Sequence, residues 1–297
     1  METFSLTMPP IYHFERTVKR LTAYEKSAFH WREGVLRRTL RAGGKPCLIE
    51  ISESKEAQPS LRIRVHASLT KQERLELEGT LRHMFALDAD LLSFYRQAEE
   101  DAHLAQVVKE RKGLHWVLEP SLYECLIKTI ISQQLNLSFA ATLIQRLVAL
   151  AGEGVKHKGE TYPVFPSPER VAELDYEDLT ARQFNRRKAE YVIDISRMVA
   201  EGSLDLEGLY RLEDEEVLER LLPLRGVGRW TAECLMLFGM GRPDLLPAAD
   251  IGLRNAVRKA YNLAVQPTEE EVRTIGEKWK PWRSYATFYL WDYITTG

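Results

Sequence analysis

The sequence predicts an α+β protein with an N-terminal antiparallel sheet and helices over residues 1–112 and an all-α domain over residues 113–297. Three observations lead to this fold class. Apolar and charged residues alternate in the first third of the chain, as in half-buried strands. Strand signals stop after about residue 112, where helix start signals take over. Near residue 226 two glycines interrupt a helical pattern, which indicates two helices joined by a tight hairpin.

The first domain contains three strand candidates and a helix. Residues 61–65 alternate apolar and charged side chains. Residues 35–41 and 47–52 flank a Gly43-Gly44 turn, which is typical of an antiparallel pair. Thr70-Lys-Gln-Glu73 is a capping box, so we expect a helix to begin there.

The second domain carries further helix start signals. Ser121-Leu-Tyr-Glu124 is a capping box that opens an apolar helix, and the helical pattern resumes over residues 139–150. Residues 152–168 are rich in glycine and proline and predict a loop. We expect later helices near residues 186–200, 213–222, 230–240, 251–262 and 268–294, the last of them after a Thr268-Glu-Glu-Glu271 capping box.

Composition and charge restrict the class of protein. No apolar run approaches the length of a membrane span, and the N-terminus lacks a signal-peptide pattern. The three cysteines are scattered without metal-site spacing, which predicts reduced thiols in a cytoplasmic protein. The net charge of −2 argues against a general nucleic-acid binder, so any such face must be local. The candidate cations are Arg225, Arg229, Arg242, Arg254, Arg258 and Lys259, with the Arg186-Arg187-Lys188 run, which is equally typical of a solvated surface.

The stretch from Leu222 to Cys234 is the most informative part of the sequence. An acidic amphipathic segment precedes Gly226-Val-Gly228, and a nearly all-apolar helix follows it. Glycines permit a sharp turn and a close approach of the backbone. The first N–H groups of the second helix have no intrahelical partner, so they can bind an anion such as phosphate beside Arg229.

A lone acid, Asp250, lies downstream of the hairpin and precedes a helical pattern. As a structural residue it is a favoured helix N-cap. As a functional residue it is a carboxylate that the dipole of the following helix keeps ionised near neutral pH. An ionised carboxylate in a cleft can stabilise an oxocarbenium-like sugar or orient water. The two interpretations are compatible.

Three other features also have a structural and a functional interpretation. Trp230 opens the second hairpin helix, and Trp291 lies near the C-terminus. Both fit an apolar core, and both fit stacking on a flipped, positively charged base. The polar segment Ser132-Gln-Gln-Leu-Asn136 fits an interhelical loop, or a wedge that fills the gap left by a flipped nucleotide.

Several segments of the chain, taken together, resemble the alkylation-repair DNA glycosylases of the helix-hairpin-helix superfamily, the DNA-3-methyladenine glycosylase II type. In chain order they are Ile131-Ser-Gln-Gln-Leu135, Arg187-Lys-Ala-Glu-Tyr191, Gly226-Val-Gly-Arg-Trp-Thr-Ala232, Leu246-Pro-Ala-Ala-Asp250 and Lys280-Pro-Trp-Arg-Ser-Tyr-Ala286. They cover the chain from about residue 115 to its end, and the N-terminal third is similar to the sheet domain of that family. The resemblance implies an active-site cleft between helical subdomains.

The resemblance also implies site residues. Asp250 would be catalytic, Trp230 and Trp291 would line the base pocket, and Gln134 would be the intercalating wedge. No cofactor would be required, although a structural Na⁺ or K⁺ would fit the hairpin. The other DNA contacts would come from Gly226, Val227, Gly228, Arg229 and Thr231, and the backbone carbonyls for the cation from Leu222, Leu224 and Val227.

The sequence also departs from the family pattern. Arg225 stands where the hairpin usually has a proline, Cys234 and Ile251 stand where pocket aromatics are expected, and Gln134 replaces an aliphatic wedge. In relatives that also nick DNA, a lysine occupies the position of Trp230, and tryptophan cannot form a Schiff base. The departures affect the expected base preference, and Trp230 predicts that the strand is left intact.

The expected function is therefore a monofunctional DNA glycosylase of base excision repair. It would remove alkylated purines such as 3-methyladenine or 7-methylguanine from double-stranded DNA, as a monomer with no membrane partner. Two alternatives remain open at the level of sequence. One is a glycosylase for oxidised or deaminated bases, and the other is a non-catalytic, damage-sensing DNA-binding protein.

Overall fold

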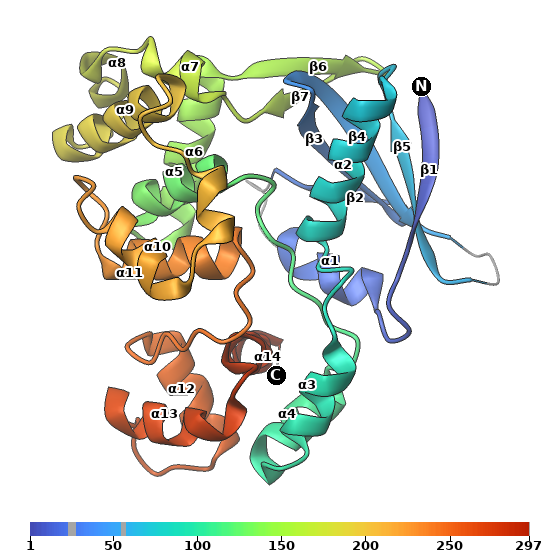
Figure 1. Ribbon diagram of the computed structural model, residues 1–297, viewed down its shortest axis with the longest axis vertical. Helices are drawn as coiled ribbons and strands as arrows, with labels where there is room; N and C mark the ends of the chain where they lie inside the picture. The colour runs from blue at the N-terminus through green and yellow to red at the C-terminus, as the bar shows by residue number, and fades with distance from the viewer. Residues whose placement is uncertain (23–27, 55–57, 297) are drawn as a thin grey trace.

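A five-stranded antiparallel sheet forms the N-terminal part of the protein. Figure 1 shows the computed structural model, which describes residues 1–22, 28–54 and 58–296. The strand order is β1-β5-β4-β3-β2. The expected pair around Gly43-Gly44 is the β3–β4 hairpin, in which Leu40 lies opposite Cys47. The strands are β1 (Glu2–Thr7), β2 (His30–Arg32), β3 (Val35–Ala42), β4 (Lys45–Glu53) and β5 (Ser60–Val65), and helices α1 (Phe14–Thr22) and α2 (Lys71–Met84) cover the apolar face.

The helices beyond the sheet pack in two groups, which lie one above the other in Figure 1. The first group contains α5 (Leu122–Ser132), α6 (Leu137–Ala151), α7 (Pro168–Ala172), α8 (Tyr176–Thr180), α9 (Arg186–Ala200), α10 (Asp214–Leu221) and α11 (Arg229–Cys234), which continues as a π-helical turn over Leu235–Gly239. The second group contains α3 (Leu91–Ala98), α4 (Ala102–Glu110), α12 (Ile251–Ala260), α13 (Glu269–Gly276) and α14 (Arg283–Thr296). No helix among the described residues is long and apolar enough to cross a membrane.

The second group crosses the expected domain boundary at residue 112. Helices α3 and α4 precede that boundary, but their apolar residues, such as Leu104 and Val108, share a core with Tyr289 and Leu290 of α14. An amphipathic helix packs where its apolar face is best covered. Its position along the chain does not determine which core that is. The sheet keeps a separate core of its own.

Residues 152–168 differ from the loop that the sequence predicts. They contain a two-stranded hairpin, β6 (Glu153–His157) and β7 (Glu160–Val164), that reaches from the helices to the sheet (Figure 1). The hydroxyl of Thr39 donates to the carbonyl of Pro163, and Arg41 Nη2 donates to Glu153 Oε1 at 2.8 Å. The loop expectation was wrong because these short strands are stabilised by packing against the sheet, where β7 buries Tyr162 and Val164, and their own short sequence does not show such contacts.

Two of the three expected capping boxes are confirmed, at Thr70–Glu73 and at Thr268–Glu271. In the third, the hydroxyl of Ser121 accepts the Glu124 N–H, but the Glu124 carboxylate binds Arg38 of β3 at 2.6 Å instead of closing the box. This buried ion pair fastens α5 to the sheet. The single helix expected over residues 268–294 is divided, because Pro281 lacks the N–H that would continue it.

Candidate active site

Asp250 is the N-cap of α12. Its Oδ1 accepts the backbone N–H of Leu253 at 2.7 Å and the indole Nε1–H of Trp291 at 2.9 Å. Within the described part of the chain, Oδ2 has neither a hydrogen-bond partner nor an ion-pair partner. The half-buried carboxylate therefore has one oxygen fixed by the protein and one that is available to a bound molecule.

Trp291 is held in place by aromatic rings from distant parts of the chain. Its ring stacks on Phe238 with a centroid distance of 6.0 Å and an interplanar angle of 17°. Trp116 meets it edge-on at 6.4 Å, and Phe288 stacks on Trp116 at 4.1 Å. The sequence singled out Trp291 but not its bond to Asp250. It also missed Phe238 and Trp116, which look like ordinary core positions.

Helix α11 lies beside Asp250. Burial raises the pKa of the Cys234 thiol to about 12, and the negative charges of Glu233 and Asp250 add to the effect. Trp230 lies one helical turn before Cys234, on the same face of α11. Trp230 is about half exposed, and Ile251, which follows Asp250, is mostly exposed. Exposed apolar side chains of this kind suit a flat, partly apolar partner, and the Asp250 carboxylate suits a positive charge on it.

The hairpin between α10 and α11 turns at Gly226. Its φ of 89° is in the left-handed region, and a Cβ there would overlap the ring of Tyr191. Only glycine fits both conditions. Gly228 is the N-cap of α11, so the first N–H groups of this helix, at Arg229 and Trp230, begin at an exposed turn.

The segment at residues 132–136 is tied to the hairpin through Gln133. Its Nε2 donates to the Gly226 carbonyl and to the Thr231 hydroxyl, both at 2.8 Å. The Thr231 side chain is buried, so what it can still offer to DNA is its backbone. The next residue, Gln134, has a φ of 56° and an exposed side chain. The loop therefore turns one glutamine inward as an anchor and the next one outward.

Lys188 binds the backbone of the same loop. The sequence grouped it with surface cations, but it is 6% exposed. Its Nζ donates to the carbonyls of Gln133 at 2.8 Å, Ile131 at 2.9 Å and Ile130 at 3.1 Å. These carbonyls lie at the C-terminal end of α5, where no further helical turn follows to supply N–H donors, and Ile130 O also accepts the Gln133 N–H at 3.3 Å. Burial lowers the pKa of the Lys188 ammonium.

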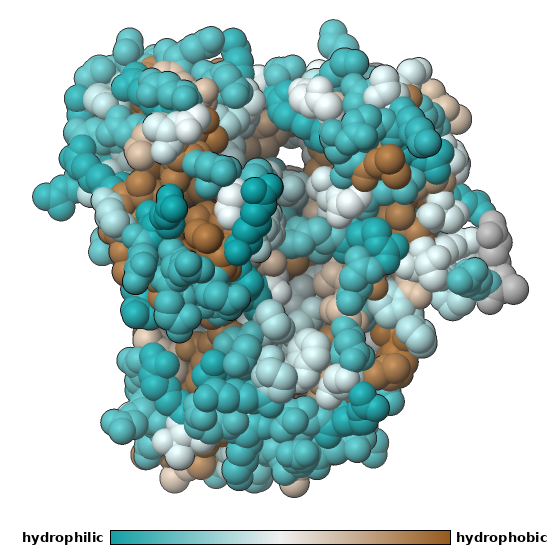
Figure 2. All heavy atoms as spheres, viewed as in Figure 1, coloured by the Kyte–Doolittle hydropathy of each residue, from teal (hydrophilic) through white to brown (hydrophobic). Residues whose placement is uncertain are grey.

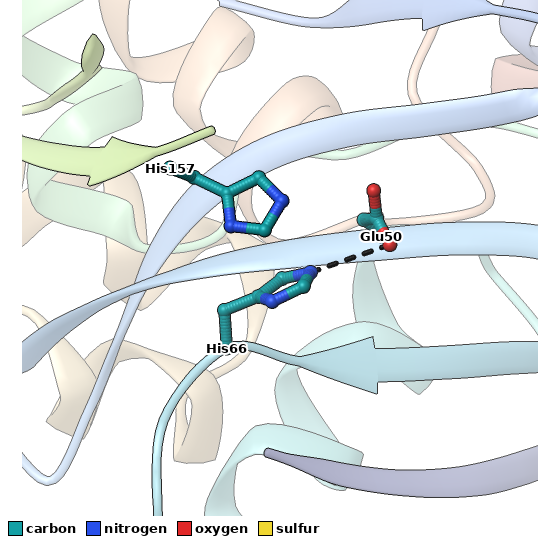
Figure 3. A group of neighbouring side chains, drawn as sticks. All are labelled: Glu50, His66 and His157. Atoms are coloured by element: carbon teal, nitrogen blue, oxygen red, sulfur yellow. Dashed lines mark ion pairs between the residues drawn. The ribbon is translucent and has the colours of Figure 1, made fainter. Parts of the chain in front are cut away.

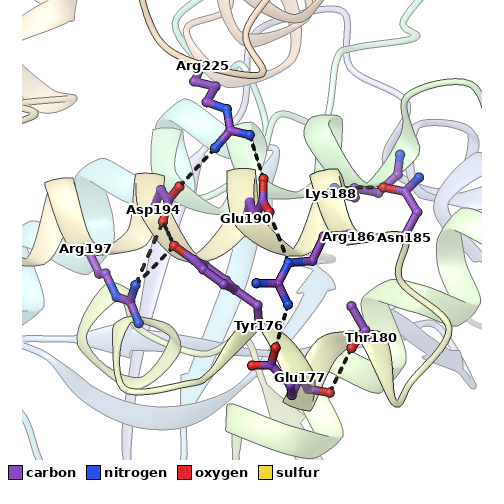
Figure 4. Close-up of polar contacts among 10 residues, drawn as sticks. All are labelled: Tyr176, Glu177, Thr180, Asn185, Arg186, Lys188, Glu190, Asp194, Arg197 and Arg225. Atoms are coloured by element: carbon purple, nitrogen blue, oxygen red, sulfur yellow. Dashed lines mark hydrogen bonds and ion pairs between the residues drawn. The ribbon is translucent and has the colours of Figure 1, made fainter.

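The other cations near the hairpin are largely paired. Arg225 reaches from the hairpin to Glu190 at 2.6 Å and to Asp194 at 3.9 Å on α9, and Arg186 binds Glu177 and Glu190 (Figure 4). Arg229 pairs with Glu233 at 3.3 Å but stays 68% exposed. Arg187 is exposed and lines a hollow of about 980 Å³ together with Gln134, Gly228 and Trp230. Arg187 therefore brings an exposed positive charge to this hollow.

A second cavity lies elsewhere. It measures about 670 Å³ and lies between the sheet and the first group of helices, which is the upper group in Figure 1. Its lining includes Thr39, Phe165 and Leu206. Figure 2 shows an opening on this side of the molecule, between the upper helices and the sheet. None of the candidate site residues lines this cavity. The candidate active site is therefore the region of Asp250, Trp291 and α11, next to the hairpin hollow.

The hairpin offers main-chain oxygens to a cation. The Leu224 carbonyl accepts the Val227 N–H at 3.0 Å and keeps a second lone pair. The carbonyls of Leu222 and Val227 follow the end of α10 and precede the start of α11. Uncharged carbonyl oxygens of this kind suit a hard cation of low charge.

Comparisons with known proteins identify the family. Residues 127–281 match the family described as HhH-GPD superfamily base excision DNA repair protein, and residues 5–116 match the AlkA N-terminal domain. The Bacillus subtilis protein YfjP is 35% identical over 97% of this chain and 98% of its own length. A second Bacillus subtilis protein, a DNA-3-methyladenine glycosylase, is 31% identical over 96% of this chain and 95% of its own.

Solved structures share the fold along the whole chain. The 3-methyladenine DNA-glycosylase of Archaeoglobus fulgidus superposes with a TM-score of 0.85 and 25% identity over 99% of this chain and 98% of that one. An 8-oxoguanine glycosylase/lyase of Clostridium acetobutylicum in complex with double-stranded DNA has a TM-score of 0.74 and 22% identity over 96% of this chain and 92% of that one, and shows the fold alone. The chain belongs to the HhH-GPD superfamily of base excision DNA repair proteins and carries an AlkA-type N-terminal domain.

Proposed function

We propose that this protein is a monofunctional DNA glycosylase that removes alkylated purines, such as 3-methyladenine and 7-methylguanine, and leaves an abasic site. It acts as a monomer in the cytoplasm on double-stranded DNA that contains damaged bases. The observation that carries the proposal is the Asp250 carboxylate, with one oxygen fixed by Leu253 and Trp291 and the other free. Relatives named as 3-methyladenine glycosylases match nearly the whole chain, which supports this substrate class.

The proposed reaction needs one negative charge. The bond between C1′ and the base breaks, and its electron pair leaves with the base, which becomes neutral because it was cationic. Positive charge develops on the sugar, where the free Oδ2 of Asp250 stabilises it. Water then adds to C1′ and loses a proton. A cationic leaving base requires little protonation, which fits a site whose proposed catalytic group is a single carboxylate.

The other site residues bind and expose the lesion. Trp230 stacks on the flipped cationic base, with Trp291 forming the wall behind Asp250. Gln134 fills the gap in the duplex, while Gln133 and Lys188 hold its loop. Phosphates meet the backbone N–H groups of the hairpin and Arg229, and the carbonyls of Leu222, Leu224 and Val227 hold Na⁺ or K⁺. Trp230 carries no amine, which supports the absence of strand cleavage.

The test is release of free base from methylated duplex DNA, measured by chromatography, with strand breaks scored before and after alkali. The proposal expects methylated purines in the supernatant and breaks only after alkali. Strand breaks without alkali would contradict the monofunctional mechanism. Release of uracil, hypoxanthine or 8-oxoguanine in preference to methylated purines would instead assign the enzyme to deaminated or oxidised bases. DNA binding without release of any base would leave a damage-sensing protein.

A further inference from the structure

Three metal-ligating side chains meet where the hairpin β6–β7 rests on the N-terminal sheet (Figure 3). Glu50 belongs to β4, His66 follows β5, and His157 ends β6. Their donor atoms all lie within 4.8 Å of one another. We call these three residues the His–Glu cluster. It lies outside the candidate active site, and none of its members serves the proposed reaction.

These donor atoms suit a divalent cation of intermediate hardness, such as Zn²⁺. Two imidazole nitrogens and one carboxylate oxygen form a common three-ligand set for Zn²⁺, with water in the fourth position. Ligand atoms about 2.0–2.1 Å from a tetrahedral ion lie about 3.4 Å from each other. His66 Nε2 and Glu50 Oε2 already lie 3.3 Å apart. Closing the third corner requires a shift of at most about 1.4 Å, which a rotation of an imidazole supplies.

The two histidines are otherwise poorly satisfied. Their ring centroids are 4.1 Å apart with an angle of 49° between the planes. His157 Nε2 is shielded from solvent and has no hydrogen-bond partner in the part of the chain that the structure describes. Buried polar atoms are nearly always paired, so an orphaned imidazole nitrogen beside a second imidazole and a carboxylate indicates a missing partner. A metal ion would satisfy both rings at once.

Two arginines set the strength of the site. Arg37 Nε binds Glu50 Oε1 at 2.8 Å, and Arg64 Nη1 binds Oε2 at 3.0 Å. Each carboxylate oxygen has a second lone pair for a metal. The positive charges nevertheless oppose a dication, and Arg64 competes for the oxygen that His66 also faces. The Arg64 side chain is 47% exposed and can turn into solvent, which would free Glu50 Oε2 for a metal.

We propose that the His–Glu cluster is a structural site for Zn²⁺ or a similar divalent transition-metal ion, which fastens the tip of hairpin β6–β7 to the sheet. Arg41 and Glu153 already join the base of the hairpin to β3. A metal at His157 would add an attachment at the other end of the hairpin, where β6 ends next to its turn. This inference does not depend on the proposed glycosylase activity.

The experiment is a titration of Zn²⁺ into the metal-free full-length protein, followed by calorimetry and by thermal unfolding. We expect one saturable site, with a melting temperature raised by the metal. His157→Ala should weaken binding by more than about tenfold and remove the thermal shift, whereas His103→Ala, an exposed histidine on α4, should change neither. Arg64→Met should bind more tightly than the wild type, because it removes an opposing charge and a competitor for Glu50.

Co²⁺ distinguishes this site from the three cysteines, because thiolate ligands give a charge-transfer absorption that nitrogen and oxygen ligands lack. The proposal is supported if the wild type forms a Co²⁺ complex that lacks this band and if His157→Ala forms no such complex. Equal binding by wild type and His157→Ala, a thiolate band, or no saturable binding at all would each overturn it.

Discussion

The bond between Trp291 and Asp250 makes a sharp prediction about catalysis. Trp291→Phe removes the Nε1–H donor that lies 2.9 Å from Asp250 Oδ1 but keeps an aromatic ring to stack on Phe238. Asp250 then retains a single restraint on that oxygen, the N–H of Leu253. The carboxylate gains freedom to rotate away from the position at which it faces the sugar, so the rate of base release should fall.

The magnitude follows from the chemistry of the bond. A hydrogen bond to a charged group contributes about 1.5–3 kcal/mol. If that contribution is lost only in the transition state, the rate falls by about 10- to 150-fold. DNA affinity should change little, because the lost bond lies within the protein. Stability should fall by less than a core truncation would cause, because the aromatic packing is kept.

Single-turnover release of methylated base from duplex DNA measures this effect, with DNA affinity measured in parallel. The matched control is Trp116→Phe, which alters the same aromatic cluster without touching Asp250. A reduction in Trp291→Phe that Trp116→Phe does not share would support positioning through the N–H. Equal reductions in both variants, or a change below about threefold in Trp291→Phe, would refute the reasoning.

Three further predictions concern the loop, the hairpin and pH. Lys188→Met removes the buried ammonium together with its three hydrogen bonds to backbone carbonyls, and it should destabilise the protein by about 2–4 kcal/mol in urea unfolding. The control, Arg187→Met, should leave stability unchanged and weaken DNA binding. Gly226→Ala forces a side chain into a left-handed, occupied position and should lower stability by about 2 kcal/mol, measured against Gly228→Ala, whose added methyl meets nothing within 4 Å. Burial lowers the pKa of His115 from 6.5 to about 4, so as pH falls through this window the unfolded state binds a proton that the folded state does not. Stability should therefore decline from pH 6.5 to pH 4, by up to about 3 kcal/mol, and His115→Gln should flatten the decline.

Local chemistry is what the sequence predicts well. The capping boxes at Thr70 and Thr268, the glycine hairpin at Gly226 and the N-cap at Asp250 each depend on residues within a few positions of each other, and the structure has all of them. The two-glycine turn of the sheet is local in the same way.

Contacts between distant segments are what the sequence does not predict. Trp291 and Asp250 are 41 residues apart, and nothing near either residue indicates their bond. Lys188 belongs to a basic run that suggests a surface, yet its acceptors lie 55 to 58 residues earlier and draw it into the interior. The hairpin β6–β7 has two short strands, so its stability depends on the sheet on which it rests.

Asp250→Asn tests the central claim most directly. Asparagine keeps an oxygen that can accept from Leu253 and Trp291, so the fold and the local geometry should persist while the negative charge is lost. The measurement is the single-turnover release of methylated purine from duplex DNA, with DNA affinity determined on the same preparation. The account predicts a loss of about 1,000-fold in release with DNA affinity unchanged or raised. Release at the wild-type rate would show that Asp250 serves only as an N-cap and that the chemistry lies elsewhere.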